Sequence, residues 1–351
     1  MDPRFIIKTH TEALRPRNYS ILITKCTYPD RSAYPEAIMR RLQDWIREKS
    51  VAQFTVLLST KKNRGFGFLL DNMLWSWKGH VINTVLSYIG KKESEELKTF
   101  DELTYIEKVC YTRYFLETEG AIILKLAERC QKMGFLTYSY LKDSIQEIFK
   151  EIYEEYMNIA SDFRSRIKIK EMYGLAKTNE HYDKSTLPHK IKPHLQALED
   201  LGILFIERKH GEEIYKPVNF DKSLSTDIIL RKLKDIENME RLFSNYEYFA
   251  LITEIYNLKP APFSCELHEK ILKESLTYGY QVMRDKVTGM ADIDSLIDWC
   301  CIKMLVENNV LVGKQNVEDL LNKIRKEQPS KILYHVDGKG RIAYLILSES
   351  L

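Results

Sequence analysis

The stretch of residues 184–220 constrains the fold more than any other part of the sequence, because it predicts a helix and two strands in a fixed order. Apolar residues three or four positions apart predict a helix that ends at Gly202; they are Leu187, Ile191, Leu195, Leu198 and Leu201. Two short β-rich runs follow at residues 203–208 and 213–218, joined by a turn at 209–212. We therefore expect a helix and a hairpin that pack on a core from elsewhere in the chain.

This order of helix, strand, turn and strand resembles the recognition helix and wing of winged-helix domains. In that superfamily the helix enters the major groove, and the wing touches the backbone or the minor groove. The resemblance implies a nucleic-acid surface of basic and amide side chains: His189, Lys190, Lys192, His194 and Gln196 on the helix, and Arg208, Lys209 and His210 on the wing. Protein contact is the alternative, because many domains of this shape bind proteins and because acidic residues of the hairpin would repel phosphate.

The overall charge does not decide the class of partner. The chain has 351 residues, with 53 lysines and arginines against 50 acidic residues, so its formal net charge is +3. An argument for nucleic-acid binding must therefore rest on local clusters. The 44% hydrophobic and 29% charged content is typical of a folded protein. We expect an α+β chain, mainly α with small β-hairpins, divided into residues 1–100, 101–220 and 221–351.

Residues 1–100 predict a small α/β domain, with β-rich runs at 19–24 and 54–60 around a helical segment at 35–49. The sequence RGFGFL at residues 64–69 resembles the first ribonucleoprotein motif of RNA-recognition domains, whose exposed aromatic residues stack on bases. The alternative is that Phe66 and Phe68 lie in the core. A metal-dependent nuclease would need clustered carboxylates to hold the ion and a lysine to orient the attacking water. The strand that leads into Lys61 contains no acidic residue, so the usual Glu-x-Lys arrangement is absent, and Asp71 is the carboxylate to test.

The strongest periodic pattern predicts one long helix over residues 141–163. Its apolar stripe comprises Leu141, Ile145, Ile148, Ile152, Tyr156, Ile159 and Phe163. This stripe suits either a helix in the core or a homodimer interface. Four basic residues follow, Arg164, Arg166, Lys168 and Lys170. In an extended segment they would form one row facing phosphates, whereas in a helix they would spread around its surface.

The carboxyl-terminal part predicts a second copy of the module. The sequence of residues 301–312 predicts a helix, a turn and a short strand, which align with residues 194–206. A further helix at 317–327 precedes a clear hairpin, with strands at 332–336 and 341–347 around Asp337-Gly338-Lys339-Gly340. The basic tip of a second wing would comprise Lys331, His335, Lys339 and Arg341, with Lys314, Lys323, Arg325 and Lys326 nearby. The alternative is an ordinary solvated hairpin.

The sequence contains no pattern that predicts catalysis. We see no phosphate-binding glycine loop, nucleophile elbow or metal-ligand spacing, and the His189 and His194 spacing does not suit a shared metal. The six cysteines are scattered, which favours free thiols in a reducing compartment. No apolar run approaches the roughly 20 residues that cross a bilayer, and the first residues do not resemble a signal peptide.

We therefore predict an intracellular protein, cytoplasmic or in the nucleoid or nucleus, that binds DNA, or alternatively RNA, without catalysis or cofactor. It would act in a replication, transcription or defence assembly, with other subunits or as a homodimer through residues 141–163. The first alternative is a structural subunit that uses the same modules for protein contacts. The second is a nuclease or another nucleic-acid enzyme with an amino-terminal catalytic domain.

Overall fold

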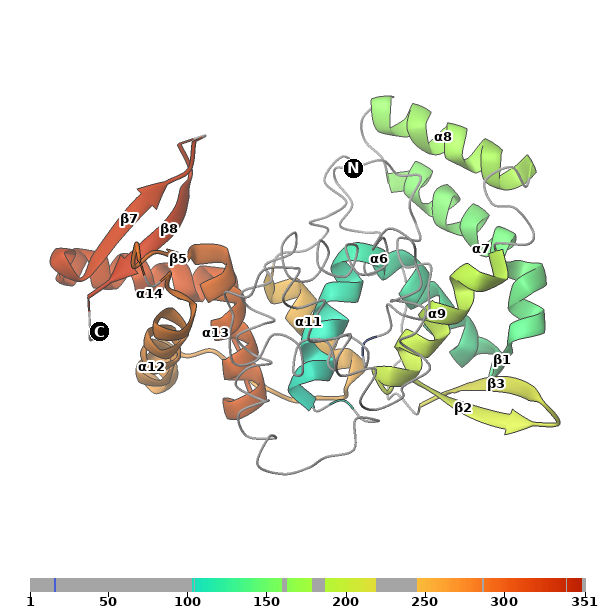
Figure 1. The fold of residues 1–351 in the computed structure, drawn as a ribbon, viewed down its shortest axis with the longest axis horizontal. Helices are drawn as coiled ribbons and strands as arrows, with labels where there is room; N and C mark the ends of the chain where they lie inside the picture. Colours follow the sequence, from blue (N-terminus) through green and yellow to red (C-terminus); the bar gives the residue numbers. More distant parts are fainter. Residues whose placement is uncertain are drawn as a thin grey trace. The chain divides into compact units, whose positions relative to one another are not determined.

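Figure 1 shows a computed structural model of the chain, in which residues 16, 103, 105–159, 163–178, 187–218, 245–285, 287–338 and 340–348 are described. These residues form helices joined by short strands, so the predicted α+β class with mainly helical content is confirmed. They group into two compact units. The predictions for residues 1–100, including RGFGFL and Asp71, lie outside the described residues apart from position 16.

The first unit comprises the described residues within 111–218, together with 254–258. Its elements are α6 (Tyr105–Met133, with residues 105–110 in the second unit), β1 (Leu136–Thr137), α7 (Tyr138–Ile159), α8 (Phe163–Thr178), α9 (Leu187–Asp200), β2 (Leu204–Lys209) and β3 (Glu212–Pro217). The strands form an antiparallel sheet in the order β1-β3-β2, with Tyr215 opposite both Leu136 and Ile206. The predicted helix and hairpin of residues 184–220 are thereby confirmed.

The turn between β2 and β3 explains the tight hairpin. His210 and Gly211 have φ angles of 51° and 81°, both in the left-handed region. A two-residue turn of the type that matches strand twist needs positive φ at both central positions, and glycine adopts it without strain. The turn therefore fixes the register in which Lys209 pairs with Glu212.

The apolar stripe of α7 lies in the core of the first unit. Its residues from Leu141 to Tyr156 are all at most 1% exposed: Leu141, Ile145, Ile148, Ile152 and Tyr156. The core interpretation of this stripe is therefore the one that the structure supports. Because the chain itself covers the stripe, these side chains are not available as the predicted homodimer interface.

The predicted long helix over residues 141–163 is shorter than expected. Helix α7 ends at Ile159, and a separate helix, α8, begins at Phe163. Phe163 is 78% exposed, so the stripe does not continue through it. Ile169 and Met172 of α8 are buried, and Tyr173 donates a hydrogen bond of 2.8 Å to Glu154 of α7. Helix α8 therefore packs alongside α7, as Figure 1 shows.

The second unit comprises residues 103, 105–110, 245–253 and the described residues of 259–348. Besides residues 245–253 of α11 (Asn245–Ile255), its elements are β4 (Ala261–Pro262), α12 (Cys265–Met283), β5 (Ala291–Asp292), α13 (Ile293–Asn308), β6 (Val310–Leu311), α14 (Lys314–Glu327), a 3-10 turn (Pro329–Lys331), β7 (Ile332–Val336) and β8 (Ile342–Leu347). An antiparallel sheet has the order β5-β8-β7, and β4 pairs with β6 in parallel. The predicted hairpin is confirmed.

The two units share an order of elements. In each, a helix leads to a two-residue strand, then further helices, then a hairpin whose second strand pairs with that short strand. In this order α9 corresponds to α14, because each directly precedes its hairpin apart from short turns. The predicted alignment of residues 301–312 with 194–206 instead pairs α9 with α13, and it stays a prediction.

Candidate nucleic-acid interface

Helix α9 presents less polar surface than the sequence predicts. His194 is completely buried, and Gln196 is 7% exposed. The Nε2 atom of His194 lies 3.3 Å from Oε2 of Glu119, which is also buried and sits where α6 departs from helical geometry. The structure contradicts the prediction that His194 and Gln196 contact nucleic acid, because neither side chain reaches the surface. The side chains of His189 and Lys190 lie outside the described part of the structure.

The basic residues of the β2–β3 hairpin lie beside acidic residues of the same hairpin. Lys209 contacts Glu207 at 2.8 Å, and Lys216 also contacts Glu207. Glu213 lies 3.7 Å from Arg208 and 3.8 Å from Lys192 of α9. These pairs reduce the positive potential that Arg208, Lys209 and Lys192 could offer a phosphate. His210 is exposed at the turn.

The pKa of Glu207 reflects these contacts. Hydrogen bonds from Lys209 and Lys216 stabilise its carboxylate and lower its pKa to about 2. Glu207 therefore keeps its negative charge at any physiological pH. This hairpin is consequently a weak candidate for phosphate contact.

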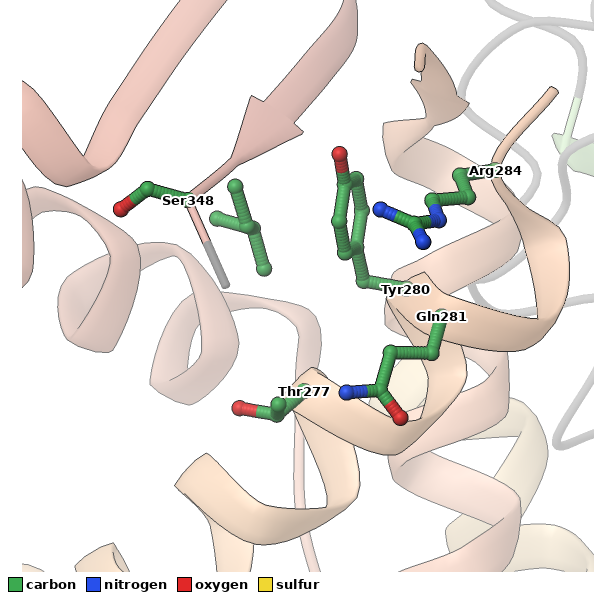
Figure 2. A pocket seen from close by; sticks show the side chains of 6 residues that line it. Thr277, Tyr280, Gln281, Arg284 and Ser348 are labelled. Carbon is green, nitrogen blue, oxygen red and sulfur yellow. The ribbon is translucent and has the colours of Figure 1, made fainter. Parts of the chain in front are cut away.

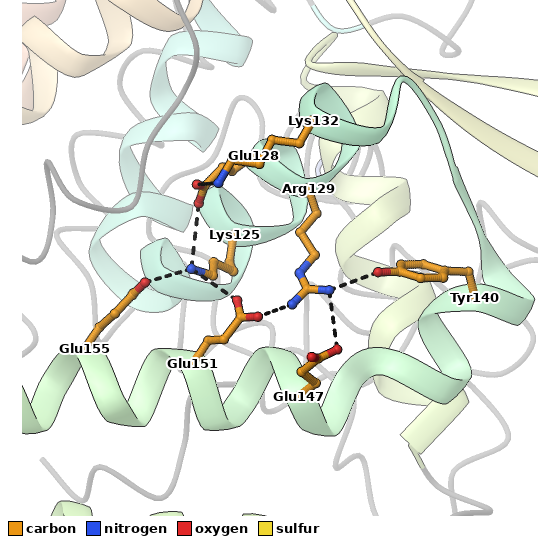
Figure 3. A network of polar contacts seen from close by, with 8 residues as sticks. All are labelled: Lys125, Glu128, Arg129, Lys132, Tyr140, Glu147, Glu151 and Glu155. Carbon is orange, nitrogen blue, oxygen red and sulfur yellow. Dashed lines mark hydrogen bonds and ion pairs between the residues drawn. The ribbon is translucent and has the colours of Figure 1, made fainter.

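An ion-pair network joins α6 to α7 in the first unit (Figure 3). Lys125 lies 2.7 Å from Glu155 and 3.3 Å from Glu151, while Arg129 contacts Glu151 and donates to Tyr140 at 2.9 Å. Burial alone would lower the pKa of Lys125, but its hydrogen bond with Glu155 and the nearby carboxylates raise it. These carboxylates of α7 are therefore matched by cations of α6, and the network holds the two helices together.

Helix α8 is the most basic surface segment of the first unit. Arg164, Arg166, Lys168 and Lys170 are all exposed, and no acidic residue lies between them. Because α8 is helical, the predicted extended row does not form. Residues four apart share a side of a helix and residues two apart do not, so these charges form two pairs on opposite flanks.

Helix α14 exposes a polar face. Val317, Leu320, Leu321 and Ile324 are at most 5% exposed and face the core. The opposite face is exposed and carries Gln315, Asp319, Asn322, Lys323 and Lys326. Gln315 donates to Asp319 at 2.8 Å, and Lys323 contacts Glu269 of α12 at 2.8 Å. Amide and basic side chains thus lie together on an accessible helix of three to four turns.

The β7–β8 hairpin lies beside α14. The Arg325 guanidinium carbon of α14 is 5.1 Å from the centre of the Tyr334 ring on β7, which couples the two elements. Arg341 is 69% exposed in its side chain and contacts Asp337 at 3.0 Å across the turn. Lys339 lies outside the described residues. Four apolar side chains of the hairpin are exposed: Leu333, Val336, Ile342 and Tyr344.

A pocket in the second unit lies between α12 and the end of β8 (Figure 2). Thr277, Gln281 and Arg284 line it with Tyr280, and Leu347 and Ser348 close the other side. Arg284 lies over the Tyr280 ring, whose hydroxyl donates to the carbonyl of Gly289 at 2.8 Å. The lining offers a single charge and no paired acid and base, so it indicates no catalytic chemistry.

Metal-binding clusters and reactive thiols are absent from the described residues, apart from one exposed cysteine. They contain no group of three or more His, Cys, Asp or Glu residues placed to hold a metal ion. Cys110, Cys130, Cys300 and Cys301 are buried free thiols, and Cys265 is an exposed one. Burial raises the pKa of Cys130 to about 12, so this thiol stays protonated and unreactive. No described helix has the length and apolar character needed to span a membrane.

Comparison of the chain with protein-family models, with curated proteins and with solved structures found no match. The function must therefore be argued from the surfaces themselves. Sequence reasoning named Lys323 and Lys326 but missed Gln315 and Asn322 beside them. The helical spacing of the apolar residues Val317, Leu320, Leu321 and Ile324 could have identified both amides, because it places Gln315 and Asn322 on the opposite face of the helix.

Proposed function

We propose that the chain binds duplex DNA through its second unit, whose helices and hairpin form a module of the winged-helix type. Helix α14 enters the major groove, and the β7–β8 hairpin lies along the adjacent backbone and minor groove. The first unit has the same order of elements, but the polar residues His194 and Gln196 of its α9 are buried. The proposal therefore assigns DNA contact to one module and a mainly structural role to the other.

The exposed face of α14 carries this proposal. Gln315 and Asn322 are amides that can donate and accept at once, which suits the edge of an adenine in the major groove. Lys326 lies four residues after Asn322 and so on the same side of the helix, where it can reach a phosphate. Arg341 at the hairpin tip adds a second exposed cation. Amides that read bases, flanked by cations that position the helix, are the combination that such binding requires.

The test is a titration of the full chain against a labelled duplex over a salt series. We expect the logarithm of the affinity to fall linearly with the logarithm of the salt concentration. Lys326→Ala should reduce the slope of this line by the amount that corresponds to about one phosphate contact. Asn322→Ala should instead weaken discrimination between sequences by about 1–3 kcal/mol and leave the slope unchanged. Lys270→Ala on α12 removes an exposed lysine outside the proposed interface and is the matched control. Absence of duplex binding at low salt would overturn the proposal.

Protein contact is the second candidate function, and the exposed outer face of the β7–β8 hairpin favours it. Leu333 and Tyr344 are 56% and 42% exposed, and their apolar surface would not contribute to phosphate binding. If the hairpin binds a second copy of the chain, sedimentation velocity will show self-association that rises with concentration and is lost in Leu333→Ser. Val287→Ser changes a side chain that is 93% exposed in a loop and serves as the control.

A further inference from the structure

The pocket between α12 and the end of β8 combines a row of polar side chains with an apolar wall (Figure 2). Thr277 and Gln281 lie on α12, and Arg284 caps its carboxyl end. These three residues are four and then three positions apart, so they lie along one face of the helix over about 10 Å. Tyr280 and Leu347, each 3% exposed, supply the apolar wall. The pocket thus offers hydrogen bonds along one side and apolar contact along the other.

Arg284 is positioned in this row and has no ion-pair partner among the described residues. Its guanidinium carbon lies 5.8 Å from the centre of the Tyr280 ring, and the Tyr280 hydroxyl donates to the carbonyl of Gly289 at 2.8 Å. The acid next to it in the sequence, Asp285, faces its own loop, where it accepts from the backbone N–H of Thr288 at 2.7 Å and from its hydroxyl at 2.9 Å. The pocket therefore keeps a positive charge that no described carboxylate neutralises.

The lining selects an anion that carries further polar groups. A guanidinium only donates hydrogen bonds, and its fork matches the oxygens of a carboxylate or a phosphate. The described lining contains no acidic residue that would repel such a group. The pocket has a volume of about 390 Å³, within the range of about 300–1,000 Å³ that small-molecule sites occupy. A ligand that reaches both Arg284 and Thr277, about 10 Å apart along the helix, must extend beyond its anionic group.

We propose that this pocket binds a small phosphate ester with a hydroxylated body, of the size of a sugar phosphate or a mononucleotide. Arg284 holds the phosphate, Gln281 and Thr277 bond the hydroxyls of the body, and Tyr280 and Leu347 contact its carbon atoms. A phosphate suits this row better than a carboxylate, because a bidentate guanidinium takes two oxygens and a phosphate keeps further acceptors for the neighbouring donors. This binding is separate from the DNA contact proposed above and does not depend on it.

The test is isothermal titration calorimetry of the full chain with adenosine monophosphate, and with adenosine, which lacks the phosphate. We expect saturable binding of adenosine monophosphate, and adenosine should bind at least about ten-fold more weakly, because it loses the charged hydrogen bonds. Arg284→Gln should weaken binding of adenosine monophosphate by a similar factor and leave binding of adenosine unchanged. Thr277→Val keeps the shape of the side chain without its hydroxyl, and it should weaken binding of both ligands by about two- to ten-fold.

Lys270→Gln is the matched control, because it removes an exposed cation from the same helix about 21 Å from Arg284 and outside the pocket lining. It should bind adenosine monophosphate like the wild type. Equal losses in Lys270→Gln and Arg284→Gln, or equal binding of the two ligands, would overturn the proposal. If adenosine monophosphate does not bind while Arg284→Gln weakens binding of a DNA duplex, the free ester is excluded and Arg284 contacts the DNA backbone instead. Thermal unfolding of each variant verifies that the fold is intact.

Discussion

Glu119 and His194 are a buried pair of ionisable residues at a break in a helix. Glu119 has φ −141° and ψ 26° within α6, and both side chains are fully buried, with 3.3 Å between Oε2 and Nε2. Removing one member deletes a contact between two buried polar side chains, which typically costs about 1–3 kcal/mol. We expect Glu119→Ala and His194→Ala each to destabilise the first unit on this scale, as measured by urea unfolding.

The double variant decides whether the two residues act together. If they do, Glu119→Ala with His194→Ala will be less destabilising than the sum of the single changes by at least about 1 kcal/mol. Additive losses would show that each side chain contributes through other contacts. The same cycle on Lys192 and Glu213, which are partly exposed and 3.8 Å apart, should give a coupling below about 1 kcal/mol.

Glu207 gives the β2–β3 hairpin a defined response to acid. Its folded-state pKa is about 2, below the ordinary glutamate value of 4.5, because hydrogen bonds from Lys209 and Lys216 stabilise the carboxylate. A group whose pKa is lowered by folding stabilises the fold above its unfolded pKa and loses that contribution as pH falls through the folded value. Glu207→Gln should therefore differ in stability from the wild type at neutral pH, and the difference should shrink between about pH 4.5 and pH 2.

A carbon-detected NMR titration of the Glu207 carboxyl measures this pKa directly. The free energy of unfolding of Glu207→Gln, followed over the same pH range, gives the linked effect on stability. Glu212 is exposed on the same hairpin, and Glu212→Gln is the control. A Glu207 carboxyl that titrates near 4.5 in the folded chain would contradict the prediction.

At the scale of elements, the contact between α12 and α13 depends on the absence of a side chain at Gly279. A Cβ there would lie 2.2 Å from Cδ1 of Trp299 and 2.9 Å from Cδ1 of Leu296. Trp299 cannot easily move, because its Nε1 donates to the carbonyl of Ser275 at 3.1 Å. We expect Gly279→Ala to destabilise the second unit by about 1–3 kcal/mol in thermal unfolding, because it overpacks this contact.

The control for this change is Gly174→Ala in α8. No atom lies within 4 Å of a Cβ at that position. Alanine favours a helix over glycine by about 1 kcal/mol, so this variant should be neutral or more stable. Destabilisation by both changes would show that the loss at Gly279 has another cause than its contact with Trp299.

The elements that the sequence predicts well are those with a local signal. The turn residues locate the strands of both hairpins to within one residue, whereas the apolar spacing locates the ends of α7 and α9 only to within about four residues. Strands β1 and β5 have two residues each and no pattern of their own. They exist because Leu136 pairs with Tyr215 and Ala291 pairs with Leu345, contacts that the sequence does not predict. Helix α12 (Cys265–Met283) is not among the elements that the sequence predicts.

The candidate site was harder to predict, for a physical reason visible in α9. An apolar stripe identifies the face of a helix that must be buried, but it does not say whether the other face is exposed. Gln196 lies off the stripe and is still buried. His194 is three residues after Ile191 and four before Leu198, so it lies on the stripe despite being polar. In α14 the same inference succeeds, because only one face of that helix is covered. Exposure of a polar face depends on the whole molecule.

At the scale of the whole molecule, the remaining question is whether both units contact one DNA duplex. The exposed basic residues of α8 belong to the first unit, and α14 belongs to the second. Each phosphate that a protein neutralises adds about 0.9 to the slope of log affinity against log salt. The slope therefore counts contacts from both units at once, wherever they lie along the duplex.

We expect joint substitution of Arg164, Arg166, Lys168 and Lys170 by alanine to reduce the salt slope of the full chain by about 2, because the two flanks of α8 cannot both face one backbone. Combining these changes with Lys326→Ala should reduce the slope further, by the sum of the separate effects, since the sites are independent. Alanine at Lys142 and Lys150 of α7 tests the effect of net charge alone. If the α8 substitutions leave the slope unchanged, only the second unit contacts DNA, and the first unit has a structural role.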